Sequence, residues 1–355
     1  MSNSSRARRT AAEVAFGGVD ITESIKPYLL SITYTDNEED EADDLQIKLQ
    51  DRDGIWMEDW LANAVDAAAD ATGLQIQAVF LRENWHTDGG DKLLDCGAFE
   101  LDSIKASGPP STITIKGTSL PYSGQVRQTL RTKAWESYSL SGIAQEIASK
   151  GGMVCMYQSG EDPYYERAEQ FQESDIAFLS GLCHDAGISL KATNNILVLF
   201  DQEEYEQKEP AFSIVKGDGS YTKYDLSIGT ADVKYSSCRV RYVDPATGVV
   251  TEGIAYADDY KEDSKNNQQL EVTAKVASVG EAQALAAKRL RLHNKYSRTA
   301  SFTFPGDPDK VAGVTVTLTG WGSWDGKYMV MQSKHSLGSS GYITQVSLRR
   351  VVEGY

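Results

Sequence analysis

The residues that could support metal or acid–base chemistry are four histidines, four cysteines and 51 acidic residues. His86, His184, His293 and His335 lie far apart, and none belongs to an H-E-x-x-H motif. The cysteines have no C-x-x-C spacing, so neither set has the ligand spacing of a zinc site. Each histidine is interpreted as a structural or surface residue, and we predict neither a metal nor a cofactor.

The densest group of carboxylates is the acidic run at residues 36–44, with the sequence D-N-E-E-D-E-A-D-D. Such a run could attract calcium, but it lacks the D-x-D-x-D-G register and the distal bidentate glutamate of a calcium loop. The default interpretation is a solvated loop between two strands. The alternative is that its acids meet a basic neighbour.

Motifs for nucleophilic and nucleotide chemistry are missing from the sequence. It has no G-x-S-x-G, no G-x-x-x-x-G-K-[ST], and no G-x-G-x-x-G that opens a helix. Fifty-one acids could supply a glycosidase pair by chance, and Trp321 and Trp324 could stack on sugars. Because no pattern selects two of the acids, we predict no catalytic residue and interpret both tryptophans as core or interface residues.

Charge narrows the class of protein further. The 355 residues include 35 Lys and Arg against 51 Asp and Glu, which gives a net charge of −16. Specific nucleic-acid binding and adhesion to anionic membranes both need clustered cations, so neither is expected. No apolar run approaches the roughly 20 residues of a membrane-spanning helix. The segment after Arg6, Arg8 and Arg9 contains Glu13 and no hydrophobic stretch, so we predict no export signal.

The elements that would position these residues follow from hydrophobic periodicity. Alternating residues at 30–34 and 45–49 predict two strands on either side of the acidic run. An alanine-rich stretch from Trp56 to Ala71 predicts a helix. Further strands are expected at residues 75–81, 97–105 and 112–117. The pattern predicts a first β-barrel domain over residues 1–118.

The middle of the chain, residues 119–204, is predicted to be a small α+β module. Ser139 is expected to cap one helix that ends at Gly151, and Ser174 to begin a second that closes at Gly187. A hairpin should follow, with strands at residues 188–191 and 196–200.

The last part of the chain, residues 205–355, is predicted to be a second β-barrel domain. It contains the clearest helical pattern, at residues 280–295. Strands are expected at residues 238–243, 249–255, 302–304, 314–318, 327–332 and 342–348. The likeness of the two β-rich ends is the nearest approach to an internal duplication. The fold class is therefore mainly β with α+β insertions.

One segment carries a resemblance to a known family. Residues 170–182 read Q-F-Q-E-S-D-I-A-F-L-S-G-L, and Gly187 and Ile188 follow. This resembles the Q-x-x-E-S-D-x-x-F-L-x-x-L…G-[IL] signature of the phage late-control D family, which includes the tail hubs of contractile phages and the N-terminal part of type VI secretion spike proteins. The signature positions are Gln170, Glu173, Ser174, Asp175, Phe178, Leu179 and Gly187. A second match to the family's final strands involves Gly306, Gly313, Gly326, Tyr328, His335, Gly341 and Tyr342.

The resemblance implies a structural baseplate hub with two tube-like β-barrels around the small module. The hub would be a homotrimer, whose six barrels form a pseudo-sixfold ring that adapts a hexameric tail tube to a trimeric spike. Implied partners are the tail tube protein, a separate spike protein because the sequence ends at Tyr355 without one, and wedge and tape-measure proteins. The location would be the tail baseplate of a virion, or of a phage-like particle such as a tailocin, assembled in the bacterial cytoplasm. The alternative is a tail-associated cell-wall hydrolase or glycan-binding protein.

Overall fold

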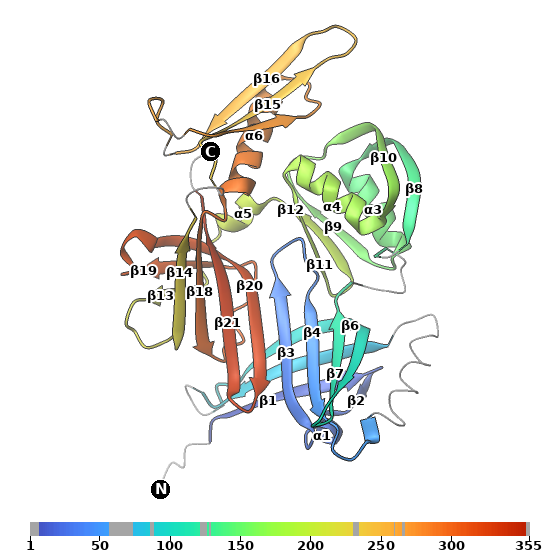
Figure 1. Cartoon of the computed structure of the whole chain (residues 1–355), viewed down its shortest axis with the longest axis vertical. Coiled ribbons are helices and arrows are strands. Elements are labelled where there is room, and N and C mark those ends of the chain that lie inside the picture. The colour runs from blue at the N-terminus through green and yellow to red at the C-terminus, as the bar shows by residue number, and fades with distance from the viewer. Residues whose placement is uncertain are drawn as a thin grey trace.

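The protein is described here by a computed structural model, which covers residues 7–56, 74–85, 89–120, 126–127, 129–229, 234–258, 260–264 and 267–352. Figure 1 shows a large β-structure at one end of the molecule and two smaller units side by side at the other. The helix predicted from Trp56 to Ala71 falls, apart from Trp56 itself, outside the described residues. None of the described helices is both long and apolar enough to cross a membrane.

The large β-structure is one sheet of 13 strands among the described residues. Seven strands come from the first third: β1 (Arg9–Phe16), β2 (Val19–Asp20), β3 (Leu29–Asn37), β4 (Asp44–Gln50), β5 (Gln75–Glu83), β6 (Lys92–Ser107) and β7 (Thr112–Thr118). Six come from the later part of the chain, residues 212–350: β13 (Phe212–Val215), β14 (Lys223–Ile228), β18 (Arg298–Pro305), β19 (Thr315–Thr319), β20 (Gly326–Gly338) and β21 (Gly341–Arg350). The predicted strands at both ends of the chain are thus confirmed. Helix α1 (Thr22–Ile25) and the 3-10 turn η2 (Gly322–Trp324) are short additions.

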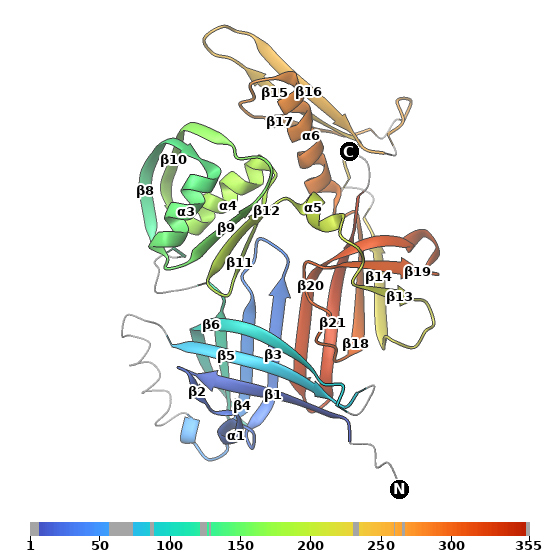
Figure 2. The same cartoon turned by 180° about the vertical axis from the view of Figure 1, so that it is seen from behind.

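The two ends of the chain join at a single strand pair. The first half of β20 pairs with β19, whereas its second half pairs antiparallel with β3, with His335 opposite Tyr34. Figure 2 shows β1, β5 and β6 crossing over β3 and β4, so the first half of the sheet curls around its own apolar face. Period-two alternation supplies this face, because every second residue of β4 (Leu45, Ile47, Leu49) is buried.

Each half of the sheet has its own hydrophobic core. The first core contains Phe80 and Phe99, and the second contains Phe302 and Tyr328. Tyr342 crosses the division: it lies on β21 but stacks on Phe80, with 5.3 Å between ring centroids. The two halves are therefore coupled by apolar contact as well as by the β3–β20 hydrogen bonds.

The elements between β7 and β13 form a small unit of helices and strands with one core. Its elements are β8 (Leu130–Ser139), α3 (Leu140–Lys150), β9 (Val154–Gln158), β10 (Tyr164–Ser174), α4 (Asp175–Ala186), β11 (Ser189–Thr193), β12 (Ile196–Phe200) and α5 (Gln202–Glu206). Strands β8 and β10 form a two-stranded ribbon, and β11, β12 and β9 form a separate sheet. The helices contribute to one core with both sheets. Ser139 and Ser174 cap α3 and α4 as predicted, and each hydroxyl accepts a hydrogen bond from a backbone N–H of the first turn.

A second small unit is inserted between β14 and β18. It consists of β15 (Ser237–Val243), β16 (Val250–Tyr256), β17 (Gln269–Thr273) and α6 (Val279–Asn294). Its three strands form their own sheet, and its core is separate from that of the large sheet. Gly253 allows α6 to lie directly on β16, since a Cβ there would come 2.4 Å from the backbone nitrogen of Gln283. The helix and hairpin predicted at residues 280–295 and 238–255 thus lie outside the 13-stranded sheet.

Candidate functional site

The residues of the family-like signature converge on the junction between β10 and α4. Gln170 is buried, and its amide nitrogen donates to Asp175 Oδ1 at 2.8 Å and to the carbonyl of Glu173 at 3.1 Å. Its amide oxygen accepts from the indole nitrogen of Trp135 at 3.3 Å. An amide can donate and accept at once. Gln170 therefore ties β8, β10 and the first turn of α4 together.

The rest of the signature packs and ends α4. Phe178 stacks on Trp135 with 6.0 Å between ring centroids, and Leu179 is buried. Gly187 closes the helix with a φ of +71°, in the left-handed region that glycine tolerates. A Cβ at Gly187 would lie 3.0 Å from Cβ of Lys288 on α6, so the signature also ends at the contact between the two small units.

The second group of predicted residues lies in the large sheet. His335 is fully buried, and its Nδ1 lies 2.7 Å from the hydroxyl of Tyr342, while Nε2 lies 2.9 Å from the hydroxyl of Ser333. Burial lowers the pKa of His335 to about 4. Gly306 lies against the ring of Tyr342, where an added Cβ would come within 2.0 Å of a ring carbon. These residues hold the seam between the halves of the sheet.

The other residues of this group have turn or core positions. Gly313, Gly326 and Gly341 have positive φ values of 76°, 138° and 81°. Tyr328 is buried, and its hydroxyl donates to the carbonyl of Trp324 at 2.8 Å. The two groups of predicted residues are not brought together, because one lies in the α+β module and the other in the large sheet.

Trp321 is a core residue. It is 5% exposed, and its indole donates to the carbonyl of Ile214 at 3.1 Å. The ring also lies in contact with Phe302, at 5.2 Å between centroids. A sugar could not stack on a ring in this position.

The acidic run connects two strands as predicted, but its interpretation as solvated throughout is wrong, because only Asp40, Glu41 and Asp44 of its acids are exposed. Asp36, Glu38 and Asp43 are buried, and the side chain of Glu39 is only 8% exposed. Their carboxylates face cations from three other parts of the fold: Lys191 Nζ lies 2.7 Å from Asp36, Arg349 Nη2 lies 2.7 Å from Glu38, and Lys295 pairs with Glu39. The alternative of a basic neighbour holds, but the neighbours belong to the same chain.

This acidic junction, defined as the run 36–43 with Lys191, Lys295 and Arg349, joins all units of the molecule. Lys191 lies on β11 of the α+β module, Lys295 directly follows α6, and Arg349 lies on β21. Each pairs with an acid at least 155 residues away in sequence. Sequence reasoning missed these three cations because no local pattern marks them.

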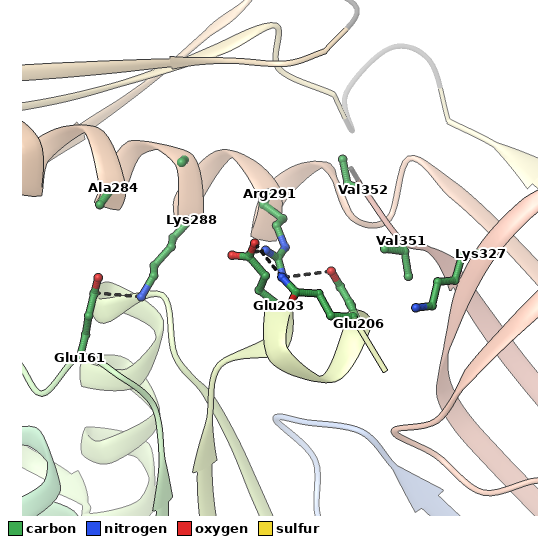
Figure 3. Close-up of a pocket in the computed structure, with 11 residues that line it drawn as sticks. Glu161, Glu203, Glu206, Ala284, Lys288, Arg291, Lys327, Val351 and Val352 are labelled. Atoms are coloured by element: carbon green, nitrogen blue, oxygen red, sulfur yellow. Dashed lines mark hydrogen bonds and ion pairs between the residues drawn. The ribbon is translucent and has the colours of Figure 1, made fainter. Parts of the chain in front are cut away.

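The junction continues to the surface through a chain of ion pairs. Arg349 also pairs with Glu206 of α5, Glu206 lies 2.9 Å from Arg291 of α6, and Arg291 lies 3.0 Å from Glu203. Glu203, Glu206 and Arg291 line a pocket of about 560 Å³, and Figure 3 shows them on one side of it, with Lys327 and Val351 on the other. The pocket is therefore the solvent-facing end of the buried charge cluster.

Burial and pairing compete at the carboxylates of the junction. Burial raises the pKa of Glu38 in spite of the attraction of Arg349. Burial also opposes the charge of Glu39, but the attraction of Lys295 outweighs it and the pKa of Glu39 is lowered. Burial raises the pKa of Asp43 to about 6. Removing one partner from such a cluster leaves a charge without compensation in a dry site, which is far more costly than losing an exposed pair.

Within the part of the chain that the structure describes, no three His, Cys, Asp or Glu side chains form a cluster that could hold a metal ion. The chemistry of the junction is thus that of matched charges and hydrogen bonds, which can position structural units. The hydroxyl of Ser189, which donates to Glu39 at 2.5 Å, belongs to the same set of buried polar contacts.

Comparisons with known proteins agree with this picture. The chain is 28% identical over 207 residues to a probable baseplate hub protein of Escherichia phage P2, covering 56% of this chain and 48% of the relative. It is 31% identical over 176 residues to a probable baseplate hub protein of Escherichia phage 186, covering 49% of this chain and 41% of the relative. The chain thus spans less than half the length of the curated relatives it matches.

The fold is similar to that of a solved tail protein from Neisseria meningitidis MC58. The TM-score is 0.68 at 12% sequence identity, over 96% of each chain. A family model described as phage tail baseplate hub (GPD) matches residues 121–341, which include the signature, both small units and most of the second half of the sheet. The chain therefore belongs to the phage tail baseplate hub (GPD) family.

Proposed function

We propose that this protein is the structural hub of a baseplate, in a contractile phage tail or a phage-like injection particle, and that three copies form a pseudo-sixfold ring. The observation that carries the proposal is the construction of the large sheet. Seven strands from residues 9–118 and six from residues 212–350 each surround a core of their own. Two similar halves in each of three copies supply six comparable positions, which match a sixfold tube.

The ends of the sheet support closure into a ring. Among the described residues, β14 pairs only with β18, and β2 only with β1. Unpaired strand edges are templates for pairing with another chain. A head-to-tail ring gives β14 and β2 of each copy a partner, whereas β13, which pairs only with β19 among the described strands, keeps its outer edge. We keep the division into tube-like barrels at residues 1–118 and 205–355 around the module at 119–204 as part of this proposal, with residues 237–294 as an insertion.

The ring would adapt a hexameric tail tube on one side to a trimeric spike on the other, with wedge and tape-measure proteins as further partners. Its location would be the tail baseplate of the particle, assembled in the cytoplasm of the bacterial host. A net charge of −16 suits a ring that a polyanion such as DNA passes through, because a like-charged lumen repels it rather than binds it.

We further propose that the role is structural and not enzymatic. The family supports this role. The buried charged residues support it too, because Arg349 pairs with Glu38 and Lys191 with Asp36 between separate units of the fold. Trp321 is buried, so it offers no support for the alternative of a glycan-binding or cell-wall-degrading protein. Zymography on peptidoglycan is the direct check, and a clear lytic band would contradict a purely structural role.

The ring is tested by native mass spectrometry of the purified chain, alone and with the tube and spike proteins of the same particle. The expected species is three times the chain mass of 38.9 kDa. A particle reconstruction at the junction of tube and spike should show three copies with six-fold pseudosymmetry. A chain that stays monomeric with both partners present would contradict the proposal.

A further inference from the structure

The ribbon of β8 and β10 carries an apolar outer face on the α+β module. Its inner face is covered, because Trp135, Ala168 and Gln170 are buried against the helices. On the outer face, Phe171 is 69% exposed and Leu130 is 68% exposed. Phe171 lies opposite Thr132 in the ladder, and Leu130 is two residues from Thr132 on the same strand. The two large apolar side chains therefore lie on one face, next to each other.

The backbone beside Phe171 is strained. The ladder shifts register between Phe171 and Glu173, so Gln172 is an extra residue, and its φ is +48°. The left-handed region is unfavourable for any residue with a Cβ. Bulges of this kind set the direction of a neighbouring side chain, and strained residues persist where surrounding contacts require them. The outward position of Phe171 is thus part of how the ribbon is built.

Acidic residues continue the same face beyond the apolar pair. Glu169 lies opposite Ala134, and Glu136 lies opposite Arg167. Arg167 is 2.6 Å from Glu169 but 3.8 Å from Glu136, so one guanidinium serves two exposed carboxylates. The ribbon face, defined as Leu130, Thr132, Ala134, Glu136, Arg167, Glu169 and Phe171, is therefore apolar at one end and carries two carboxylates with one guanidinium, a net negative charge, at the other.

We propose that the ribbon face docks an extended segment of another tail protein, in which an apolar residue is followed two positions later by Lys or Arg. Same-face side chains of an extended segment are about 6.6 Å apart, the spacing of successive pairs along the ribbon. The apolar residue packs on Phe171 and Leu130, and the cation pairs with Glu169 and Glu136. Charge complementarity favours a basic partner over a second copy of a chain whose net charge is −16. The inference rests on the proposed hub function, which supplies the tail partners.

Binding is tested with the full-length chain immobilised on a biosensor. The probes are the purified tube, spike and wedge proteins of the same particle, each measured at 50 and 500 mM NaCl. We expect one of them to bind the wild type and to bind Phe171→Ser and Leu130→Ser at least tenfold more weakly. Glu169→Lys should weaken binding mainly at low salt. The matched control is Val154→Ser on β9, at a residue that is 64% exposed in the same module, and it should bind like the wild type.

Melting temperature and native mass separate the outcomes. Phe171→Ser should melt like the wild type and keep the same oligomeric mass. If the variant loses that mass, the face belongs to a second copy and the proposal is wrong. Equal binding of the wild type and Phe171→Ser to every probe would also overturn it. If the wild type proves monomeric yet loses a tail partner through Phe171→Ser, the ring fails while the docking face stands.

Discussion

Two junctions in this molecule are built from opposite kinds of contact. At the β10–α4 junction, Gln170 forms hydrogen bonds with neutral and charged groups that are 3 to 35 residues away in sequence. At the acidic junction, buried carboxylates meet cations that are 155 to 311 residues away. The first holds one small unit together, and the second holds separate units on the large sheet. The difference indicates that local hydrogen bonds define the module, whereas the arrangement of the modules depends on buried charge pairs.

The most damaging change should be the loss of a cation at the acidic junction. Arg349→Met keeps most of the side-chain volume but leaves Glu38 and Glu206 without their shared partner. Breaking a buried pair in this way costs about 3–5 kcal/mol. Urea unfolding followed by tryptophan fluorescence measures the loss.

The neighbouring residue supplies the control for that change. Arg350 is partly exposed and donates to the carbonyl of Ser323 at 3.3 Å. Arg350→Met should cost less than about 1 kcal/mol. Similar losses in the two variants would mean that the buried charges do not hold the units in place.

The seam beside the acidic run should respond to pH through His335. This residue lies opposite Tyr34 on the strand that leads into the run, and burial lowers its pKa to about 4 from 6.5. The unfolded chain binds a proton at a higher pH than the folded chain. The contribution of neutral His335 to the free energy of unfolding is therefore fully present above pH 6.5 and is lost as the pH falls toward 4. Over this range the free energy of unfolding should fall by up to about 1.4 kcal/mol for each pH unit.

The variant His335→Gln isolates this titration. It removes the ionisable ring, so its unfolding free energy should change less between pH 6.5 and 4.5 than that of the wild type. Only the slopes are compared, because the substitution also lowers stability at neutral pH by breaking the contacts with Tyr342 and Ser333. Parallel slopes would show that His335 is not buried in its neutral form.

At the β10–α4 junction the expected loss of stability is smaller than at the acidic junction. Gln170→Leu removes the oxygen that accepts from the Trp135 indole and the N–H that donates to Asp175. Leaving buried polar groups without a partner costs about 1–3 kcal/mol. Hydrogen exchange should show faster opening confined to α4 and the ribbon, while the large sheet keeps its protection. A global loss of protection would contradict the idea that this junction acts only within the module.

The same contrast explains what the sequence could predict. Strand alternation located β3 and β4, and serine and glycine positions located both ends of α4, because these signals lie within a few residues of the element. The pairing of β3 with β20 and the burial of Glu38 by Arg349 join residues about 300 apart. From the sequence alone a run of acids is interpreted as a solvated loop, because the cations that neutralise it are distant in sequence and only the fold brings them together.

The smallest expected effect concerns the strained ribbon, which belongs to the local side of the comparison. Gln172→Gly relieves the left-handed backbone, and Gln172→Ala keeps it, so their difference isolates strain from side-chain loss. The glycine variant should be more stable than the alanine variant by up to about 1 kcal/mol, measured by urea unfolding. An alanine variant as stable as the glycine variant would mean that the bulge carries no strain. If the glycine variant gains the expected stability, the left-handed backbone at Gln172 lowers the stability of the wild type. Such a loss is expected at a site where the direction of Phe171 matters more than stability.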